Sequence, residues 1–174
     1  MKHEVYRRLG ELSEASDKEY GKLVQKLLAI AFCKAGAVRL VERSTQGIDL
    51  EVTLPDERQI AVEVKTAQDQ TVKFGKKDLD GLASQIEAGL EPYFAALGSQ
   101  LLDEWILARY DIGEIKPNQQ YRLTQLRAYR DTELEDSIRE HFDEAVIECT
   151  NLPDTNRQAA LDEVLRSFSC VSVA

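Results

Sequence analysis

The sequence predicts an α/β fold whose elements follow the order α-β-β-β-α-β over residues 17–109. Three observations predict it. A segment with a helix-start signal and a helical apolar stripe comes first. Two segments that alternate apolar and polar residues then flank a short turn. A second helical pattern leads into another apolar, strand-like segment.

The first helix is predicted over residues 17–35. Ser16 and Glu19 have the spacing of a capping box, in which the serine caps the helix and the glutamate reaches back to it. Gly36 stands where a glycine commonly ends a helix. An apolar stripe at helical spacing joins the two ends: Leu23, Val24, Leu27, Leu28 and Ala31.

Three strands are predicted next. Residues 37–42 are short and β-like, and residues 48–54 and 59–65 both alternate with a period of two. The turn between the last two strands contains Pro55 and polar residues, which is typical of a hairpin.

The later elements are predicted from weaker patterns. After a polar linker we expect a second helix over residues 77–90 and a strand at residues 105–108. Beyond these we expect a helix over 119–142, a short strand at 146–147 and a helix over 154–167. The predicted division is a core over residues 1–110 and a mostly helical C-terminal extension over 111–174, packed on the core or used for dimerisation.

The register of the hairpin follows from its apolar faces, because side chains alternate across a strand. One apolar face is predicted to hold Ile48, Leu50, Val52 and Leu54. The facing strand matches it with Ile60, Val62 and Val64. Matching the faces puts Val52 opposite Ile60, and it also puts Leu50 opposite Val62.

The same register places two carboxylates face to face. Asp49 lies opposite Glu63 with Cβ atoms roughly 5 Å apart, and Lys65 lies on the same face, roughly 7 Å along the strand. Paired carboxylates repel unless a cation neutralises them, and hard oxygen ligands suit Mg²⁺. A nearby lysine can stabilise charge that develops on a phosphate. The hairpin therefore predicts a site for metal-assisted phosphodiester hydrolysis, and the alternative is an ordinary half-exposed hairpin with solvated acids.

These residues carry a resemblance to a known family. Residues 47–52 (Gly-Ile-Asp-Leu-Glu-Val) and 61–66 (Ala-Val-Glu-Val-Lys-Thr) resemble the PD-(D/E)xK phosphodiesterase superfamily. Its members include restriction endonucleases, archaeal Holliday-junction resolvases and Mrr-like enzymes. The resemblance covers residues 17–109 and implies a restriction endonuclease-like core, in which helices flank a mixed sheet.

The resemblance also implies roles for the site residues. Asp49 and Glu63 would bind Mg²⁺ or Mn²⁺ with help from the main-chain carbonyl of Val64, and Lys65 would be the catalytic lysine. The position before Asp49 is Ile48 and not the proline of the pattern, a departure that many members tolerate.

Members of this superfamily often carry a glutamate on the first helix that contacts the metal through water. Glu19 is expected in this catalytic role, although its capping of Ser16 is an equal alternative. Gln25, one and a half turns further along the helix, is the second candidate.

A lysine-rich segment follows the site directly. Lys73, Lys76 and Lys77 are expected to contact the phosphates of a nucleic acid, and Gln68 is expected near the substrate. The alternative is an ordinary solvated loop.

The net charge of -9 argues against a nucleic-acid partner, but the acidity is local. Residues 131–163 hold eleven Asp or Glu and two Arg, so this segment alone accounts for -9, and the rest of the chain is neutral. Such segments are usually solvated helix faces, and the alternative is a DNA mimic or a surface for a protein partner.

Other features exclude several classes of protein. No stretch is long and apolar enough for a membrane span, and the first residues lack the apolar centre of a signal peptide, so a cytoplasmic protein is expected. Cys33, Cys149 and Cys170 form no C-x-x-C pair and are expected to be free thiols. The phosphate-binding motifs of NTPases and dinucleotide enzymes are missing.

The sequence therefore predicts a Mg²⁺-dependent nuclease, expected to be an endonuclease, whose partner is DNA on the strength of the resemblance. A homodimer is a second expected association. The alternative is an inactive nuclease-fold module that binds nucleic acid or a protein, and a third choice is an RNA-directed enzyme of the same fold.

Overall fold

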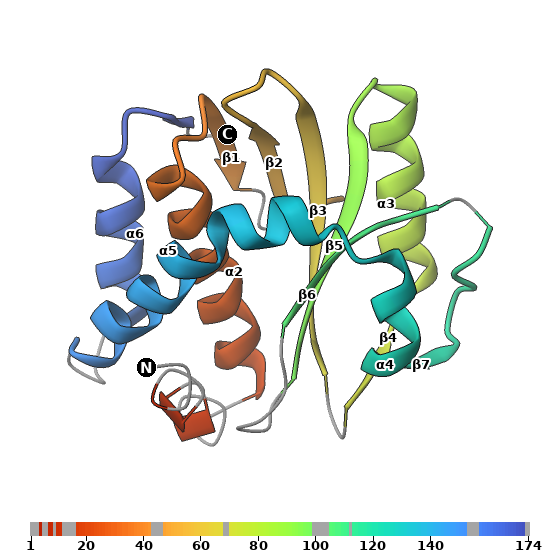
Figure 1. Ribbon diagram of the computed structural model, residues 1–174, viewed down its shortest axis with the longest axis horizontal. Helices are drawn as coiled ribbons and strands as arrows, with labels where there is room; N and C mark the ends of the chain where they lie inside the picture. Colours follow the sequence, from red (N-terminus) through yellow and green to blue (C-terminus); the bar gives the residue numbers. More distant parts are fainter. Residues whose placement is uncertain are drawn as a thin grey trace.

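The computed structural model describes residues 4, 7, 8, 10, 11, 17–42, 47–67, 70–98, 105–111, 113–152 and 157–172. Along the chain its helices and strands are α2 (Asp17–Lys34), β1 (Arg39–Glu42), β2 (Leu50–Thr53), β3 (Gln59–Ala67), β4 (Thr71–Lys73), α3 (Lys76–Glu87), β5 (Glu91–Gly98), β6 (Ile106–Arg109), β7 (Gln120–Arg122), α4 (Leu123–Leu126), η1 (Arg127–Tyr129), α5 (Thr132–Thr150), α6 (Arg157–Ser167) and β8 (Val171–Ser172). Figure 1 shows their arrangement.

Within the described residues, six strands form one mixed sheet in the order β6-β5-β3-β2-β1-β8. The neighbours β1–β2, β2–β3 and β5–β6 are antiparallel, and β3–β5 and β1–β8 are parallel. Strands β4 and β7 form a separate antiparallel pair. Strand β3 is therefore an interior strand of the main sheet, and it carries three of the predicted site residues, Glu63, Val64 and Lys65.

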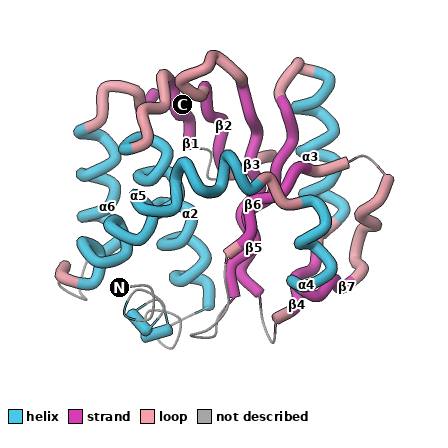
Figure 2. Tube along the Cα trace, in the orientation of Figure 1, coloured by secondary structure: helices cyan, strands magenta, loops and turns pink. Residues whose placement is uncertain are grey.

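Helices cover both faces of this sheet (Figures 1 and 2). Helices α2, α5 and α6 share one buried apolar cluster with residues of β2, β3 and β5. Helices α3 and α4 and the β4–β7 pair share a second cluster with the opposite face. The predicted arrangement of a mixed sheet flanked by helices is confirmed.

Helix α2 confirms the prediction for residues 17–35. The predicted apolar stripe is buried. Gly36 has a φ of 91°, in the left-handed region that favours glycine. Its N–H donates to the carbonyl of Cys33, and the N–H of Ala37 donates to that of Phe32, so the helix ends in a Schellman motif. Ser16, the predicted capping residue, lies outside the described residues.

Strand β5 is a correction to the predicted order. Strand β5, not the segment at 105–108, is the element that follows α3, and the predicted strand at 105–108 is β6. The sequence Glu-Pro-Tyr-Phe-Ala-Ala-Leu-Gly does not alternate, because β5 is an interior strand buried on both faces. Pro92 also argues against a strand in sequence-based reasoning.

Three further expectations were wrong. The polar linker after β3 contains strand β4, which pairs with β7. Residues 119–142 are not one helix, because β7, α4 and η1 precede the start of α5 at Thr132. Residues 146–147 are helical and lie within α5. The predicted helix over 154–167 is observed as α6.

The C-terminal extension packs on the core through a buried ionic cluster. Glu135 of α5 is fully buried and accepts a hydrogen bond from the main-chain N–H of Leu107 in β6 at 3.3 Å. Arg130 donates to the same carboxylate from Nε at 2.7 Å, and Arg139 pairs with it from the next turn. A buried carboxylate needs such partners, so these contacts fix α5 beside the sheet. The predicted boundary between residues 110 and 111 stays a prediction.

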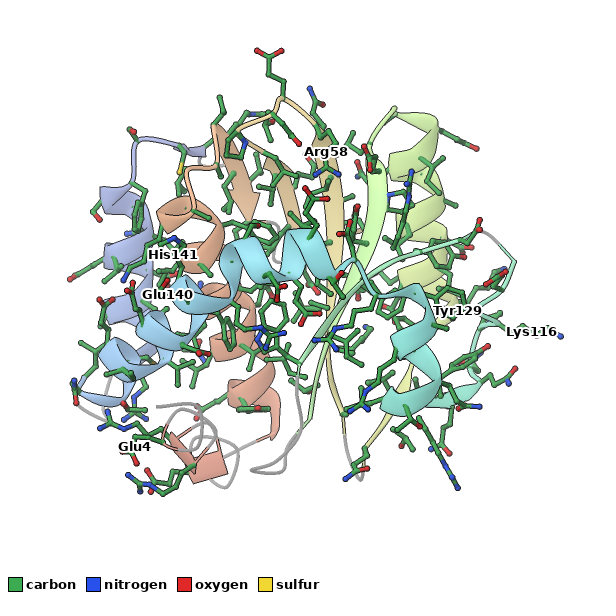
Figure 3. All side chains as sticks on the ribbon, viewed as in Figure 1. Glu4, Arg58, Lys116, Tyr129, Glu140 and His141 are labelled. Carbon is green, nitrogen blue, oxygen red and sulfur yellow. The ribbon has the colours of Figure 1, made fainter. Side chains whose placement is uncertain are left out.

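Apart from Glu135, the acidic character of this segment belongs to the surface. Exposed carboxylates on α5 include Glu133, Asp136, Glu140, Glu144 and Glu148. Figure 3 labels Glu140 and His141 on this helix. The solvated-face interpretation therefore applies to most of the described acids of α5.

The cysteines are free thiols, as expected. Cys33 at the end of α2 and Cys170 before β8 are nevertheless neighbours, with Sγ atoms 3.2 Å apart. Among the described residues, no helix has the length and apolar character needed to cross a bilayer.

Candidate active site

The hairpin register brings the two predicted carboxylates together. Val52 pairs with Ile60 and Leu50 with Val62, as predicted. Asp49 lies just before the start of β2, and its Oδ2 accepts a hydrogen bond from the main-chain N–H of Val64 at 2.8 Å. The side chain of Asp49 is therefore held against β3 directly beside Glu63.

The segment before Asp49 turns away from the strand, and one prediction fails there. Ile48 does not share a face with Leu50, because it belongs to the buried cluster on the α3 side of the sheet. Gly47 has a φ of 110°, which favours glycine. Its carbonyl carbon lies only 3.3 Å from where a side chain on Gly81 of α3 would begin. Two glycines thus allow this segment to pack closely against α3.

Glu63 is the most buried member of the site, with 4% of its surface exposed. Its Oε1 lies 2.7 Å from Nζ of Lys65. Its Oε2 is buried and has no hydrogen-bond partner among the described residues. A buried carboxylate oxygen without a partner is costly, so this atom fits a site that binds a cation.

Lys65 contacts a carboxylate that sequence reasoning missed. Its Nζ lies 2.8 Å from Oδ2 of Asp78, in the first turn of α3. The same oxygen accepts a hydrogen bond from the main-chain N–H of Gly75 at 2.7 Å. The spacing of Gly75 and Asp78 is that of a helix N-cap and its third residue, which was the available local signal. The contact with Lys65 itself depends on the packing of α3 against β3.

The charges of the site act on one another. Burial first, and then neighbouring Asp49, raise the pKa of Glu63 to about 7, against the opposing effect of Lys65. Burial also raises the pKa of Asp49, against the opposing effects of the Val64 N–H and Lys65. Burial disfavours the charged form of Lys65, but Glu63 and Asp78 outweigh it and the pKa of Lys65 is raised. The site therefore combines a carboxylate pair that resists double ionisation with a lysine that keeps its proton.

On α2, Gln25 contacts the main chain of the site at Asp49, and the role expected for Glu19 stays a prediction. Nε2 of Gln25 lies 3.4 Å from the main-chain oxygen of Asp49 and 3.3 Å from Oε1 of Glu42. Glu42, on β1, is also paired with Lys26. Glu19 is exposed and lies six residues earlier on the helix, roughly 9 Å along the axis and about 120° around it.

Three of the four residues predicted to contact nucleic acid lie among the described residues. Lys73 ends β4, and Lys76 and Lys77 open α3, and all three side chains are exposed. The first turn of α3 also holds Asp78, so two of the lysines adjoin the site in sequence and in space. Gln68 lies outside the described residues.

The site can be tested as a metal site from its own atoms. The described residues contain no group of three His, Cys, Asp or Glu side chains placed to share one ion. Two adjacent carboxylates are present, however, and one of them has a buried oxygen without a partner. Carboxylate and carbonyl oxygens are the ligands that Mg²⁺ and Mn²⁺ prefer. The residues present therefore fit a divalent cation held by two carboxylates, a main-chain carbonyl and water.

Comparisons with known proteins bear on the fold. No protein-family model matches the chain, and no curated protein matches its sequence. Among solved structures, the chain is similar to Hjc, a Holliday junction resolvase from the archaeal hyperthermophile Archaeoglobus fulgidus. The TM-score is 0.54 at 15% sequence identity, and the match covers 67% of this chain and 95% of the Hjc chain.

This likeness confirms the predicted fold class. The chain has a mixed sheet flanked by helices and a helical C-terminal part, and its fold is similar to that of this resolvase.

Proposed function

We propose that the chain is a divalent-metal-dependent nuclease that hydrolyses phosphodiester bonds in DNA. One observation carries the proposal. Two carboxylates, Asp49 and Glu63, lie side by side and largely buried, and Lys65 lies beside them. Within the described part of the chain, Oε2 of Glu63 has no hydrogen-bond partner. The similarity in fold to a Holliday junction resolvase supports the proposal, and the resemblance of residues 47–52 and 61–66 to the PD-(D/E)xK superfamily implies a site at this hairpin.

Each residue has a proposed part. Asp49 and Glu63, with the main-chain carbonyl of Val64, would hold Mg²⁺ or Mn²⁺. The chemistry that such a cation supplies is polarisation of a phosphate oxygen and activation of water. Lys65, which is cationic, would stabilise the negative charge that develops on the phosphate. Gln25 supports the main chain at Asp49, and we assign it, in place of Glu19, as the helix residue that faces the site.

The substrate is proposed from the fold and from exposed lysines. Lys73, Lys76 and Lys77 would contact phosphates near the site, with Gln68 nearby on the chain. DNA is preferred to RNA because the similar solved structure is that of a Holliday junction resolvase. Endonuclease action and a homodimer belong to the same proposal.

The test is cleavage of a mixed panel of duplex, single-stranded and branched DNA, together with RNA. The protein is assayed with Mg²⁺, Mn²⁺ or EDTA, beside Lys65→Ala and the control Lys34→Ala at the far end of α2. We expect metal-dependent cutting that falls roughly a hundredfold in Lys65→Ala and is unchanged in the control. If no nucleic acid is cut and no metal is bound, the chain is better explained as an inactive binding module.

A further inference from the structure

The ammonium group of Lys65 lies between two carboxylates from different layers of the fold. Its Nζ is 2.7 Å from Oε1 of Glu63 and 2.8 Å from Oδ2 of Asp78. Glu63 belongs to β3, and Asp78 belongs to the first turn of α3. The two carboxylates can therefore play different parts, although both touch the same lysine.

Asp78 is fixed in place without Lys65. Its Oδ2 accepts the main-chain N–H of Gly75 at 2.7 Å, which closes the first turn of α3. A carboxylate in the first turn is also favoured by the helix dipole. Only 22% of the Asp78 side chain is exposed, so little water competes for the carboxylate. Asp78 thus presents a stationary acceptor to the lysine.

Glu63 is a less constant partner. Its Oε2 is buried and unpartnered among the residues described, so its carboxylate is the one suited to bind a cation. A divalent charge on Glu63 would oppose the ammonium of Lys65, because like charges in a buried site repel. The contact with Asp78 comes from a different element, helix α3, and would remain.

We propose that Asp78 is a positioning residue, which holds the ammonium of Lys65 beside the site while Glu63 binds a divalent cation. This inference rests on the proposed function, because it concerns the lysine of the same site. Asp78 does not touch the reacting groups and acts through Lys65. In its absence the lysine would have one anionic partner, and that partner would be shared with the metal.

The test compares two variants of α3. Asp78→Asn keeps the size of the side chain and an oxygen that can accept the Gly75 N–H, but it removes the charge. Asp80→Asn makes the same change at an exposed position two residues away. Thermal melting followed by circular dichroism establishes that both variants are folded before they are compared.

The first readout is independent of nuclease activity. The side-chain ¹⁵Nζ signal of Lys65, assigned by its loss in Lys65→Arg, reports how firmly the ammonium is held. In the presence of Mg²⁺ we expect slow hydrogen exchange with water in the wild type and in Asp80→Asn, and much faster exchange in Asp78→Asn. Unchanged exchange in Asp78→Asn would overturn the proposal.

The second readout is the kinetics of cutting. In Asp78→Asn the acceptor of the Lys65 ammonium loses its charge, and we therefore expect kcat to fall roughly tenfold. KM and the affinity for Mn²⁺ should stay within about twofold of the wild type. A defect confined to KM overturns the proposal. Faster exchange at Lys65 in proteins that cut nothing would support the positioning by Asp78 and reject the proposed function.

Discussion

Replacing Glu63 with glutamine isolates the electrostatic cost of the site, because glutamine has the shape of the protonated acid. Burial, and then nearby Asp49, raises the pKa of Glu63 from 4.5 to about 7 in the folded chain. One pKa unit corresponds to about 1.4 kcal/mol, so ionised Glu63 lowers the free energy of unfolding by about 3 kcal/mol. In the metal-free protein this charge opposes folding.

The direction of the pH dependence follows from the raised pKa. Because the folded value lies above the unfolded one, the contribution of Glu63 to stability is complete below pH 4.5 and is lost as the pH rises through about 7. Glutamine does not titrate. In EDTA, Glu63→Gln should therefore be more stable than the wild type by about 3 kcal/mol near pH 8 and by less than about 1 kcal/mol near pH 5.

Urea denaturation at the two pH values measures this difference. The matched control is Glu140→Gln on the exposed face of α5, labelled in Figure 3, which should not differ from the wild type at either pH. Saturating Mg²⁺ should stabilise the wild type more than Glu63→Gln, because the ligand binds the folded state. The reasoning would be refuted if Glu63→Gln were less stable than the wild type near pH 8 in EDTA. It would also be refuted if the difference in the free energy of unfolding were the same at both pH values.

Three further changes test other parts of the structure. Gly81→Ala places a methyl group 3.3 Å from the carbonyl carbon of Gly47. A Mn²⁺ titration should therefore show weaker binding, and the free energy of unfolding should lack the gain of about 1 kcal/mol that alanine brings to an ordinary helix position. A more stable protein with unchanged affinity would show that the segment before Asp49 is free to move. Glu135→Ala removes the buried carboxylate that pairs with Arg130 and Arg139, whose side chains are only 20% and 14% exposed, and it should lower the free energy of unfolding in urea by up to about 3–5 kcal/mol. A loss below about 1 kcal/mol would mean that the cluster is solvated. Cys33 and Cys170 have Sγ atoms 3.2 Å apart, so oxidised glutathione should take two electrons and two protons from the two thiols, which leaves one protein disulfide and two molecules of reduced glutathione. Mass spectrometry should show a loss of about 2 Da and the cross-linked peptide, whereas two separate glutathione adducts would argue that the thiols cannot approach.

The hairpin and its paired carboxylates could be predicted because a period of two leaves one way to match the apolar faces. Val52 opposite Ile60 fixes the register, and that register brings Asp49 to Glu63. The face of Ile48 was predicted wrongly because β2 begins only at Leu50, and side chains alternate between faces only within a strand.

The features that the sequence did not predict depend on contacts between residues that are far apart in the sequence. Asp78 meets Lys65 only because α3 packs against β3, and a capping pattern at the start of a helix does not show which lysine it will face. The contact of Gln25 with the main chain of Asp49 depends on how α2 packs across the sheet, which the sequence of the helix does not show. Strand β5 was not predicted because a strand that is buried on both faces does not alternate between apolar and polar residues.

The most direct test of the site is calorimetric titration of Mn²⁺ into the metal-free protein, since it requires no knowledge of the substrate. The wild type is compared with Asp49→Asn, which keeps the hydrogen bond from the Val64 N–H but loses the charge, and with the exposed control Asp80→Asn. We expect saturable binding in the wild type and the control, and affinity lowered at least roughly tenfold in Asp49→Asn. Equal binding by all three proteins, or by none, would contradict the claim that Asp49 and Glu63 form a divalent-cation site.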